Sequence, residues 1–184
     1  MLVLASLSPR RRELLGLIRT DFVTVAPDAD ETPPPGLPPE QVVQVLAQRK
    51  AESLSAAYPG NTILGADTIV VLDGAILGKP ADEAEAHIML RALSGRSHTV
   101  YTGVALLHNA SLTCFCEQTQ VYVRALTEEE ITDYIRTGEP MDKAGAYGIQ
   151  GRAAPFISGI CGDYYTVVGL PLCALDQKLK AMGA

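Results

Sequence analysis

The sequence predicts an α/β fold, because short apolar runs with strand character alternate along the chain with amphipathic stretches of helical period. Its 184 residues are enough for one sizeable α/β domain or for two small lobes that share a cleft. Hydrophobic residues make up 47% of the chain, and with three Phe and no Trp the core must be mainly aliphatic. No internal repeat or clear linker interrupts the pattern, so we treat residues 1–184 as a single domain.

The first 25 residues predict a strand, a helix and a second strand. The apolar run 2–5 is typical of a buried strand. Ser8 is a favourable N-cap residue and Pro9 suits the first helical position, so a helix is expected from Pro9 to about Ile18. A short strand over residues 22–25 follows.

Residues 26–39 predict a mobile, extended loop, because prolines recur throughout this stretch. Three carboxylates interrupt the loop, and Glu31 is notable because it follows closely on the preceding strand. Apolar positions of helical period then predict a helix over 40–57. Lys50 is expected at the inner edge of that helix, one turn beyond Leu46.

The next apolar run, 63–72, predicts a buried strand that contains one acid, Asp67. An unpaired carboxylate among such neighbours would be costly, so we expect a cation, a metal ion or a cluster of donors beside it. Asp73-Gly74 predicts a two-residue turn into a strand over 75–77, and a tight loop that contains Lys79 follows.

The second half of the chain predicts five further elements. They are a helix over 82–93, two long strands over 98–107 and 112–123, a helix that begins with a capping box at Thr127 and ends at Gly138, and a last helix over 172–182. Residues 139–151 hold several glycines and too few large apolar side chains for a core segment, which favours a ligand-lining loop. Ile157 is expected to form a hairpin with residues 160–165.

Charge and hydropathy exclude several classes of protein. The net charge of −6 argues against a general nucleic-acid or anionic-membrane surface, and no apolar run approaches the roughly 20 residues that span a bilayer. The N-terminus has no signal-like stretch, so a cytoplasmic protein is expected. Local positive charge for a small anion could come from basic residues in motif-like segments, namely Arg10, Arg11, Arg12, Lys50, Lys79, Arg96 and Lys143.

Cysteine and histidine patterns favour structural roles over metal binding. The four cysteines, Cys114, Cys116, Cys161 and Cys173, contain no C-x-x-C pair and are expected to be buried free thiols. The three histidines, His87, His98 and His108, fall on three different predicted elements, where a surface or hydrogen-bonded structural role is favoured.

The start of the first helix is the strongest candidate for a ligand site. Its unpaired N–H groups and the hydroxyls of Ser6 and Ser8 are expected to point at one spot, together with up to three guanidiniums, those of Arg10, Arg11 and Arg12. This density of donors suits a polyphosphate. Arginines are unfavourable at the positive end of the helix dipole, which argues against an ordinary solvated first turn.

The remaining polar inventory suits metal-assisted phosphoryl chemistry. The chain has no P-loop, no G-x-G-x-x-G after the first strand, no G-x-S-x-G elbow and no helical histidine pair. Carboxylate ligands select Mg²⁺ or Mn²⁺, cations neutralise charge on a leaving phosphate, and a carboxylate can orient or deprotonate the attacking water.

Five ordered motifs and a closing one carry a resemblance to a known family. They are Ser6-x-Ser8-Pro9-Arg10-Arg11, Gly65-Ala66-Asp67-Thr68, Gly78-Lys79-Pro80, Ser94-Gly95-Arg96-x-His98, Glu139-Pro140-x-Asp142-Lys143-Ala144-Gly145-Ala146-Tyr147-Gly148-Ile149-Gln150-Gly151 and Tyr165-x-Val167-Val168-Gly169-Leu170-Pro171. From residue 2 to about 175, the chain resembles the Maf family of nucleoside triphosphate pyrophosphatases.

The resemblance implies a fold and a reaction. The fold is an elongated mixed β-sheet flanked by helices, with two lobes around a deep cleft, in a homodimer. The reaction is metal-dependent hydrolysis between the α and β phosphates. Asp67 matches the family's proposed proton acceptor, and the polar cleft positions match Ser8, Arg10, Glu31, Lys50, Lys79 and Asp142. Arg10, Thr68 and Gln150 match positions that are tied to base choice in the family. The stretch 146–151 around Gln150 resembles that of the branch that acts on dTTP and UTP.

From residues and resemblance together we expect three groups of site residues. The catalytic group is Asp67, Lys50 and Lys79; the ligands of Mg²⁺ or Mn²⁺ are Glu31 and Asp67; and the substrate-binding group is Ser6, Ser8, Arg10, Arg11, Thr68, Asp142, Lys143 and Gln150. Whether Asp67 acts as base, metal ligand or both stays open. Two alternatives also stay open: a nucleotide-binding regulator of septum formation with little turnover, and the 7-methyl-GTP branch of the family, which Gln150 disfavours.

Overall fold

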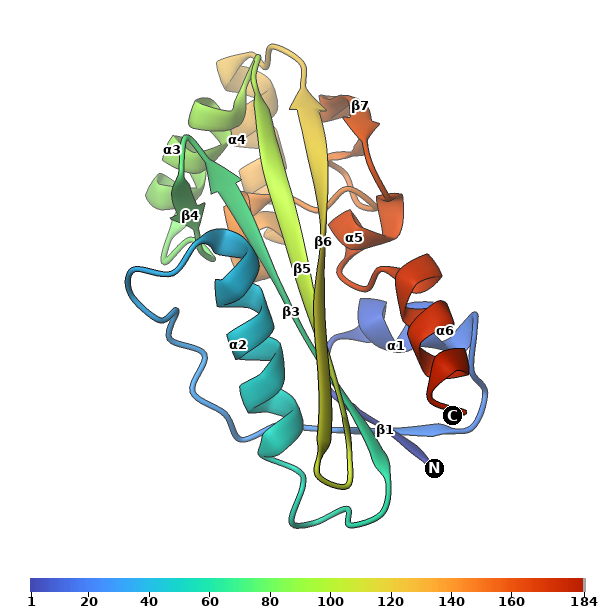
Figure 1. Cartoon of the computed structure of the whole chain (residues 1–184). Helices are drawn as coiled ribbons and strands as arrows, with labels where there is room; N and C mark the ends of the chain where they lie inside the picture. Colours follow the sequence, from blue (N-terminus) through green and yellow to red (C-terminus); the bar gives the residue numbers. More distant parts are fainter. Residues whose placement is uncertain (184) are drawn as a thin grey trace. The chain divides into compact units, whose positions relative to one another are not determined.

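The computed structural model describes residues 1–183 and confirms a mixed β-sheet flanked by helices (Figure 1). Seven strands form the sheet in the order β2-β1-β3-β5-β6-β7, and β4 pairs with β3. The strands are β1 Leu2–Ala5, β2 Phe22–Val25, β3 Thr62–Leu72, β4 Ala75–Leu77, β5 Ser97–His108, β6 Ser111–Val123 and β7 Ile157–Cys161.

The chain divides into two compact units. Unit 1 comprises residues 1–68, 102–117 and 169 onward, and unit 2 comprises residues 69–101 and 118–168. Strands β3, β5 and β6 contribute residues to both units.

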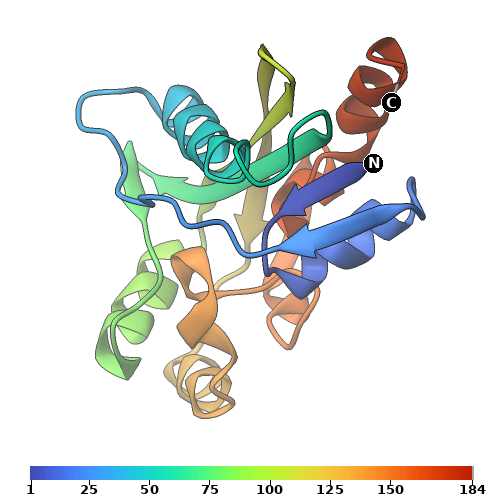
Figure 2. The ribbon, with the colours of Figure 1, turned by 90° about the horizontal axis from the view of Figure 1, so that it is seen from below.

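Unit 1 is built on three parallel strands. Strand β1 pairs in parallel with β2 and β3, which sets Ala5 opposite Val25 on one side and Gly65 on the other. Helix α2, Pro39–Glu52, covers one face of this part of the sheet, while α1, Pro9–Gly16, and α6, Leu172–Ala181, lie on the other (Figures 1 and 2). The expected N-cap is confirmed, because the Ser8 side chain accepts a hydrogen bond from the backbone N–H of Arg11.

Helix α2 packs on the sheet at two glycines. A Cβ at Gly65 would lie 2.1 Å from the carbonyl oxygen of Ala47, and one at Gly103 would lie 2.4 Å from the carbonyl of Val43. Backbone therefore meets backbone, which only glycine permits at these strand positions. The helix ends at Glu52, five residues before the boundary expected from the sequence.

Unit 2 is built around two helices and parts of the three long strands, namely the end of β3, the start of β5 and the end of β6. The Asp73-Gly74 turn leads into β4 as expected. Helices α3, Glu83–Leu93, and α4, Glu128–Arg136, lie side by side (Figure 1), and α4 begins with the predicted capping box. Their apolar faces share one core with Val70, Val121 and Phe156.

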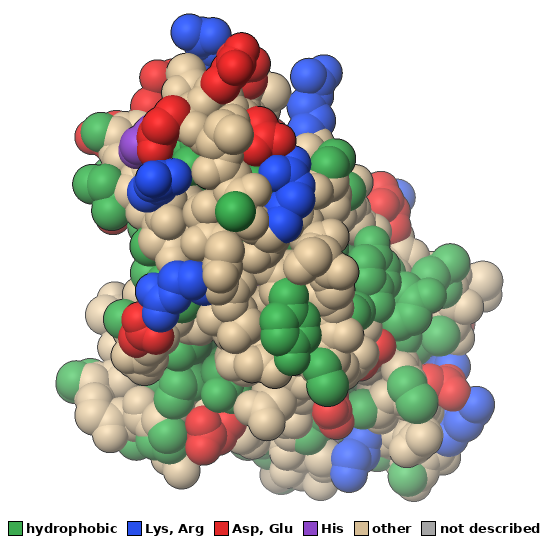
Figure 3. Space-filling model, turned by 90° about the horizontal axis from the view of Figure 1, so that it is seen from above, with side chains coloured by type: hydrophobic (Ala, Val, Ile, Leu, Met, Phe, Trp, Pro, Cys, Tyr) green, Lys and Arg blue, Asp and Glu red, His purple; other side chains and the backbone are tan. Residues whose placement is uncertain are grey.

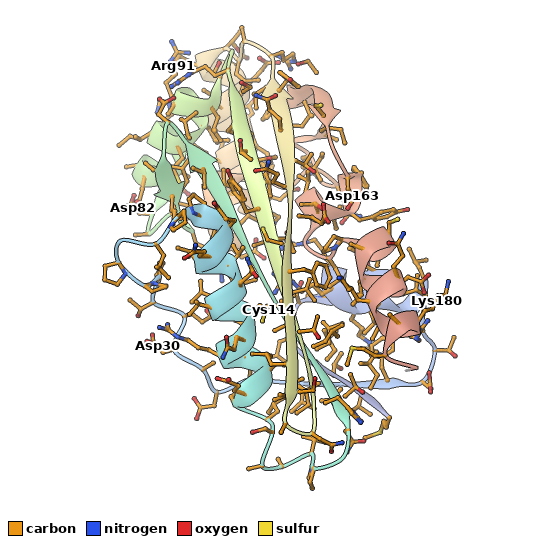
Figure 4. The ribbon with its side chains drawn as sticks, in the orientation of Figure 1. Asp30, Asp82, Arg91, Cys114, Asp163 and Lys180 are labelled. Carbon is orange, nitrogen blue, oxygen red and sulfur yellow. The ribbon has the colours of Figure 1, made fainter. Side chains whose placement is uncertain are left out.

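The expected hairpin near residue 160 is wrong. Strand β7 pairs antiparallel with β6, and the following residues form a short helix, α5, Tyr164–Val168. The reason is local: Asp163 (labelled in Figure 4) accepts hydrogen bonds from the backbone N–H groups of Tyr165 and Thr166, which caps a helix where strand was expected.

All four cysteines are free thiols, but the expectation that they are buried is wrong. Cys161 and Cys173 are exposed, and Cys114 and Cys116 are half-buried on β6. Figure 4 labels Cys114, which lies near the start of that strand. Local apolar sequence around Cys161 and Cys173 does not decide which way either side chain points.

The surface shows no segregation of charge on the face seen in Figure 3, where basic and acidic side chains are intermixed. Among residues 1–183, no helix is both long enough and apolar enough to cross a membrane.

Candidate active site

Unit 1 brings three of the predicted site residues together around one ammonium group. The Lys50 Nζ lies 2.6 Å from Asp67 Oδ1 and 2.8 Å from Glu31 Oε1. Lys50 is only 5% exposed, and its two ion pairs offset part of the cost of burying an ammonium group. The cation expected beside Asp67 is therefore confirmed, and it is Lys50.

The packing of α2 on β3 explains this contact. Gly65 and Asp67 are two residues apart, so their side-chain positions point to the same face of β3. Ala47 and Lys50 are about one turn apart on α2. The close approach of Ala47 to Gly65 therefore sets Lys50 over Asp67.

The start of α1 lies next to this cluster through the pairing of β1 with β3. Ala5 is opposite Gly65, so the chain leaves β1 toward Ser6 at the level where β3 approaches Asp67. The Ser8 N–H donates to Ser6 Oγ at 3.1 Å, and Ser8 Oγ accepts from the Arg11 N–H at 3.4 Å. Both hydroxyls act as acceptors here and keep their own hydrogens for a ligand.

The arginines of α1 differ in their surroundings. Arg11 donates from Nε to the Gly169 carbonyl at 2.9 Å and from Nη2 to Thr68 Oγ1 at 3.0 Å. Burial lowers the pKa of the Arg11 guanidinium, and the nearby charge of Asp67 partly opposes that shift. Arg12 is exposed and lines a hollow of about 480 Å³ with Ser6 and Ser8. Of the up to three guanidiniums expected at one spot, that of Arg11 is bonded to Gly169 and Thr68, whereas Arg12 lines the hollow.

Thr68 joins Arg11 to the sheet. Its hydroxyl contacts the hydroxyl of Thr102, a fully buried residue on β5, at 2.9 Å. Thr68 therefore holds the Arg11 guanidinium against β3 and β5. Arg10, the neighbouring predicted ligand, is half-buried on the first turn of α1.

Unit 2 holds the other four predicted site residues in two neighbouring loops. Lys79 is exposed in the loop after β4, and Asp142, Lys143 and Gln150 belong to the segment 139–151. The two loops are joined, because the Gly145 N–H donates to the Gly78 carbonyl at 3.0 Å.

Lys143 is tied into its own segment. Its Nζ lies 2.7 Å from the Glu139 carbonyl oxygen and 2.6 Å from Asp142 Oδ1. Its stem crosses Gly148, where a Cβ would lie 2.8 Å from the Lys143 Cε. Gln150 is exposed at the far end of the segment.

Comparison with known proteins identifies the family. The profile described as "Maf-like protein" matches residues 1–182. The chain belongs to the Maf family. It is 55% identical over 182 residues to a protein of Symbiobacterium thermophilum named dTTP/UTP pyrophosphatase, covering 99% of this chain and 94% of that one. It is 54% identical over 182 residues to one of the same name from Geobacillus, covering 99% and 98%.

A structural relative supports the fold. The solved structure of the Staphylococcus aureus Ham1 protein matches 98% of both chains with a TM-score of 0.59 at 14% identity. The family predicted from the motifs is thus confirmed, and so are its mixed sheet and its relationship to named nucleoside triphosphate pyrophosphatases.

The segment 139–151 of this Maf protein contradicts one expectation from the sequence. It was expected to have too few large apolar side chains to be core, yet Pro140, Ala146 and Tyr147 are buried. Tyr147 packs in the same core as α3 and α4. The large aromatic residue Tyr147 among glycines was the signal, because a glycine-rich stretch loses much conformational entropy on ordering and needs an anchor to hold it.

Glu139 and Gly151, at the two ends of the segment, support its conformation, and the sequence alone assigned neither residue a role. The Glu139 carboxylate accepts hydrogen bonds from Tyr134 Oη and from the Arg152 N–H, both at 3.0 Å. A Cβ at Gly151 would lie 2.0 Å from Glu139 Oε1, so the glycine makes room for this carboxylate. Both residues stand in the motif, at its two ends, but the sequence does not show that they contact each other.

The carboxylates of Glu31 and Asp67 can supply some, but not all, of the ligands that a divalent cation needs. Their carboxylates contact the same ammonium, so both lie close enough to serve one hard cation. Among residues 1–183, no group of three or more His, Cys, Asp or Glu is arranged to hold a metal. The residues therefore fit Mg²⁺ or Mn²⁺ held by one or two carboxylates together with water and phosphate oxygens, which is how magnesium is commonly bound beside nucleotides.

Proposed function

We propose that this chain hydrolyses dTTP and UTP to the nucleoside monophosphate and pyrophosphate, by attack of water on the α phosphorus. The observation that carries the proposal is the Asp67 carboxylate held 2.6 Å from a buried lysine at the carboxyl end of the parallel strands. Relatives at 55% and 54% identity that are named dTTP/UTP pyrophosphatase support the choice of substrate.

In this proposal Asp67 orients the attacking water and accepts its proton. Lys50 fixes the orientation of that carboxylate and of Glu31 through its two ion pairs. A divalent cation, when bound, supplies positive charge to the phosphate oxygens. Ser6, Ser8 and Arg10 bind phosphate oxygens through hydroxyl hydrogens, backbone N–H groups and a guanidinium at the start of α1.

The unit 2 residues have separate roles in the proposal. Lys79 neutralises charge on the leaving pyrophosphate, as a cation near a leaving group does. Asp142 and Lys143 bind substrate as one ion-paired unit, since their side chains are 2.6 Å apart. Gln150 offers both an amide donor and an acceptor, which matches the edge of a thymine or uracil ring. In unit 1, Arg10 and Thr68 also contribute to base choice, and the hydrogen bond from Arg11 fixes the Thr68 side chain.

The test is a panel of nucleotides. Pyrophosphate and orthophosphate release are measured for dTTP, UTP, CTP, 7-methyl-GTP and ITP with Mg²⁺, with Mn²⁺ and with EDTA. We expect pyrophosphate from dTTP and UTP at the highest kcat/KM, and loss of turnover in EDTA. Release of orthophosphate, or a preference for 7-methyl-GTP, contradicts the proposal.

The alternative of a regulator of septum formation gives a different result in the same panel. Such a protein binds dTTP or UTP with a divalent cation and releases no pyrophosphate. A buried Lys50 held between two carboxylates favours the enzyme, because a simple binding site does not need a polarised carboxylate.

We propose further that the enzyme is a cytoplasmic homodimer. Light scattering after gel filtration tests the dimer.

A further inference from the structure

We propose that His98 is a positioning residue that acts through Tyr147 to hold the segment 139–151 in its ligand-binding conformation. The inference rests on the proposed function for its consequence in catalysis, but its structural part stands on unit 2 alone. The segment carries Asp142, Lys143 and Gln150, so its conformation fixes where these side chains lie.

The contact between the two residues is short and buried. His98 lies on β5, and its Nε2 is 2.7 Å from Tyr147 Oη. The two rings meet edge to face with centroids 5.3 Å apart. His98 is 3% exposed and Tyr147 is 7% exposed, so water does not compete for this hydrogen bond.

Counting donors assigns the direction of the hydrogen bond. Among the described residues, His98 Nδ1 is the one buried side-chain nitrogen or oxygen without a hydrogen-bond partner. If Tyr147 donates to Nε2, one N–H group at Nδ1 is left unsatisfied. If Nε2 donates instead, the Tyr147 hydroxyl hydrogen and the Nδ1 lone pair are both left unsatisfied. The first arrangement leaves fewer groups unpaired, so Tyr147 donates and a neutral His98 accepts.

Neutrality of His98 agrees with its surroundings. Burial lowers the pKa of the imidazole to about 4, so the ring carries no charge at neutral pH and its Nε2 lone pair is available. The acceptor is therefore constant across the range in which a nucleotide pyrophosphatase would be assayed.

The backbone before Tyr147 explains why an anchor is needed. Gly145 has φ 69° and Ala146 has φ 60°, and the second is a conformation that residues with a side chain adopt rarely. A non-glycine residue stays in this region when the surrounding contacts over-determine it. Tyr147 supplies such a contact directly after Ala146, and Glu139 fixes the other end through Tyr134 and Arg152.

Releasing Tyr147 therefore lets the backbone at Ala146 relax. The Gly145 N–H to Gly78 carbonyl bond lies one residue away and would be weakened with it. Asp142, Lys143 and Gln150 would then sample several positions, and substrate would have to order them on binding.

Four variants isolate the hydrogen bond. His98→Leu removes the acceptor and keeps an apolar side chain in the core, whereas His98→Gln can place an amide oxygen near the position of Nε2 and restore it. Tyr147→Phe removes only the hydroxyl. The double variant His98→Leu/Tyr147→Phe leaves no orphaned hydroxyl, so we expect it to be more stable than His98→Leu alone.

Hydrogen–deuterium exchange of amides 143–151 tests the structural part without any substrate. We expect exchange about tenfold faster in His98→Leu and Tyr147→Phe than in the parent, which follows from losing one buried hydrogen bond. His98→Gln should exchange within about twofold of the parent. Exchange in His98→Leu and Tyr147→Phe equal to the parent overturns the inference.

Kinetics separate positioning from a general loss of stability. With dTTP we expect KM to rise about fivefold to tenfold in His98→Leu and Tyr147→Phe, with kcat within about threefold of the parent and KM restored in His98→Gln. A lower melting temperature with unchanged KM means a merely structural role and overturns the inference. If the parent releases no pyrophosphate, the proposed function fails, and the exchange measurement alone decides the role of His98.

Discussion

The unit 1 cluster of Glu31, Lys50 and Asp67 and the unit 2 segment 139–151 are held in place by different physical means. In unit 1, two of the three side chains project from a regular helix and a regular strand whose backbones touch at Gly65. In unit 2, the segment consists of turns and short 3₁₀ helices, Glu139–Asp142 and Ala144–Ala146. Its conformation depends on a part-buried hydrogen bond at Glu139 and a buried one at Tyr147.

From this difference we expect the two regions to respond differently to substitution. Unit 1 should fail when charge balance or backbone packing is changed. In unit 2, removing a single hydrogen bond should loosen the segment 139–151 locally at a small cost in global stability, because its turns have no ladder of repeated backbone bonds to share the loss.

Lys50→Met should have the largest effect. Removing the ammonium leaves the carboxylates of Glu31 and Asp67 facing each other without a cation. We expect pyrophosphate release to fall by about 100-fold to 1,000-fold while the circular dichroism spectrum stays that of the parent. Lys178→Met on the exposed face of α6 is the matched control and should leave the rate unchanged. Equal rates in the two variants would remove Lys50 from the catalytic group.

Gly65→Ala tests the packing of α2 on β3. The new Cβ would lie 2.1 Å from the Ala47 carbonyl oxygen and 2.9 Å from the Ala51 nitrogen, so the helix must shift. We expect the free energy of unfolding to fall by about 3 kcal/mol. Gly16→Ala, which has nothing within 4 Å of its Cβ, should change it by less than about 0.5 kcal/mol. Urea denaturation of both variants would contradict the packing account if it gave equal midpoints.

The pH dependence of stability tests the buried imidazole of unit 2. The pKa of His98 is lowered to about 4 in the folded chain from an ordinary value of 6.5. The unfolded chain thus binds a proton first, so this residue's contribution to stability is present above pH 6.5 and is lost as pH falls toward 4. At pH 5 the free energy of unfolding should be about 2 kcal/mol lower than at pH 7 on account of this group.

His98→Gln should remove that part of the acid sensitivity. Denaturation of the parent and the variant at pH 7 and pH 5 measures the difference directly. An identical pH dependence in both proteins would mean that His98 is not buried as a neutral ring.

Tyr134→Phe should have the smallest effect. It removes one hydrogen bond to Glu139 Oε1 and the acceptor of the Gly148 N–H. The Glu139 carboxylate keeps its bonds to the Arg152 N–H, so we expect a loss of about 1 kcal/mol in the free energy of unfolding. A loss comparable to that in Gly65→Ala would mean that the two regions do not differ in the way described.

The sequence predicted the regular parts of the molecule well, and the reason is periodicity. The aspartate inside the apolar run of β3 predicted a cation, a metal ion or a donor cluster beside it, and Lys50 was expected at the inner edge of the helix. That the two side chains meet is shown by the structure. The capping box of α4 and the N-cap at Ser8 were equally local.

The irregular parts were not predictable for the same reason. The roles of Glu139, Tyr134 and His98 depend on contacts between residues far apart in the chain and on positive φ angles, which leave no periodic trace. The helix at Tyr164 formed because Asp163 caps it, although the surrounding residues also suit a strand. The motifs showed that residues 139–151 matter, but only the structure shows what holds them.

The most direct measurement is pyrophosphate release from dTTP by Asp67→Asn compared with the parent. The substitution keeps the shape of the side chain and removes the carboxylate that Lys50 contacts at 2.6 Å. We expect a rate about 1,000-fold lower while the circular dichroism spectrum stays that of the parent, since the variant cannot accept the proton of the attacking water. A rate within about threefold of the parent would contradict the account of this site.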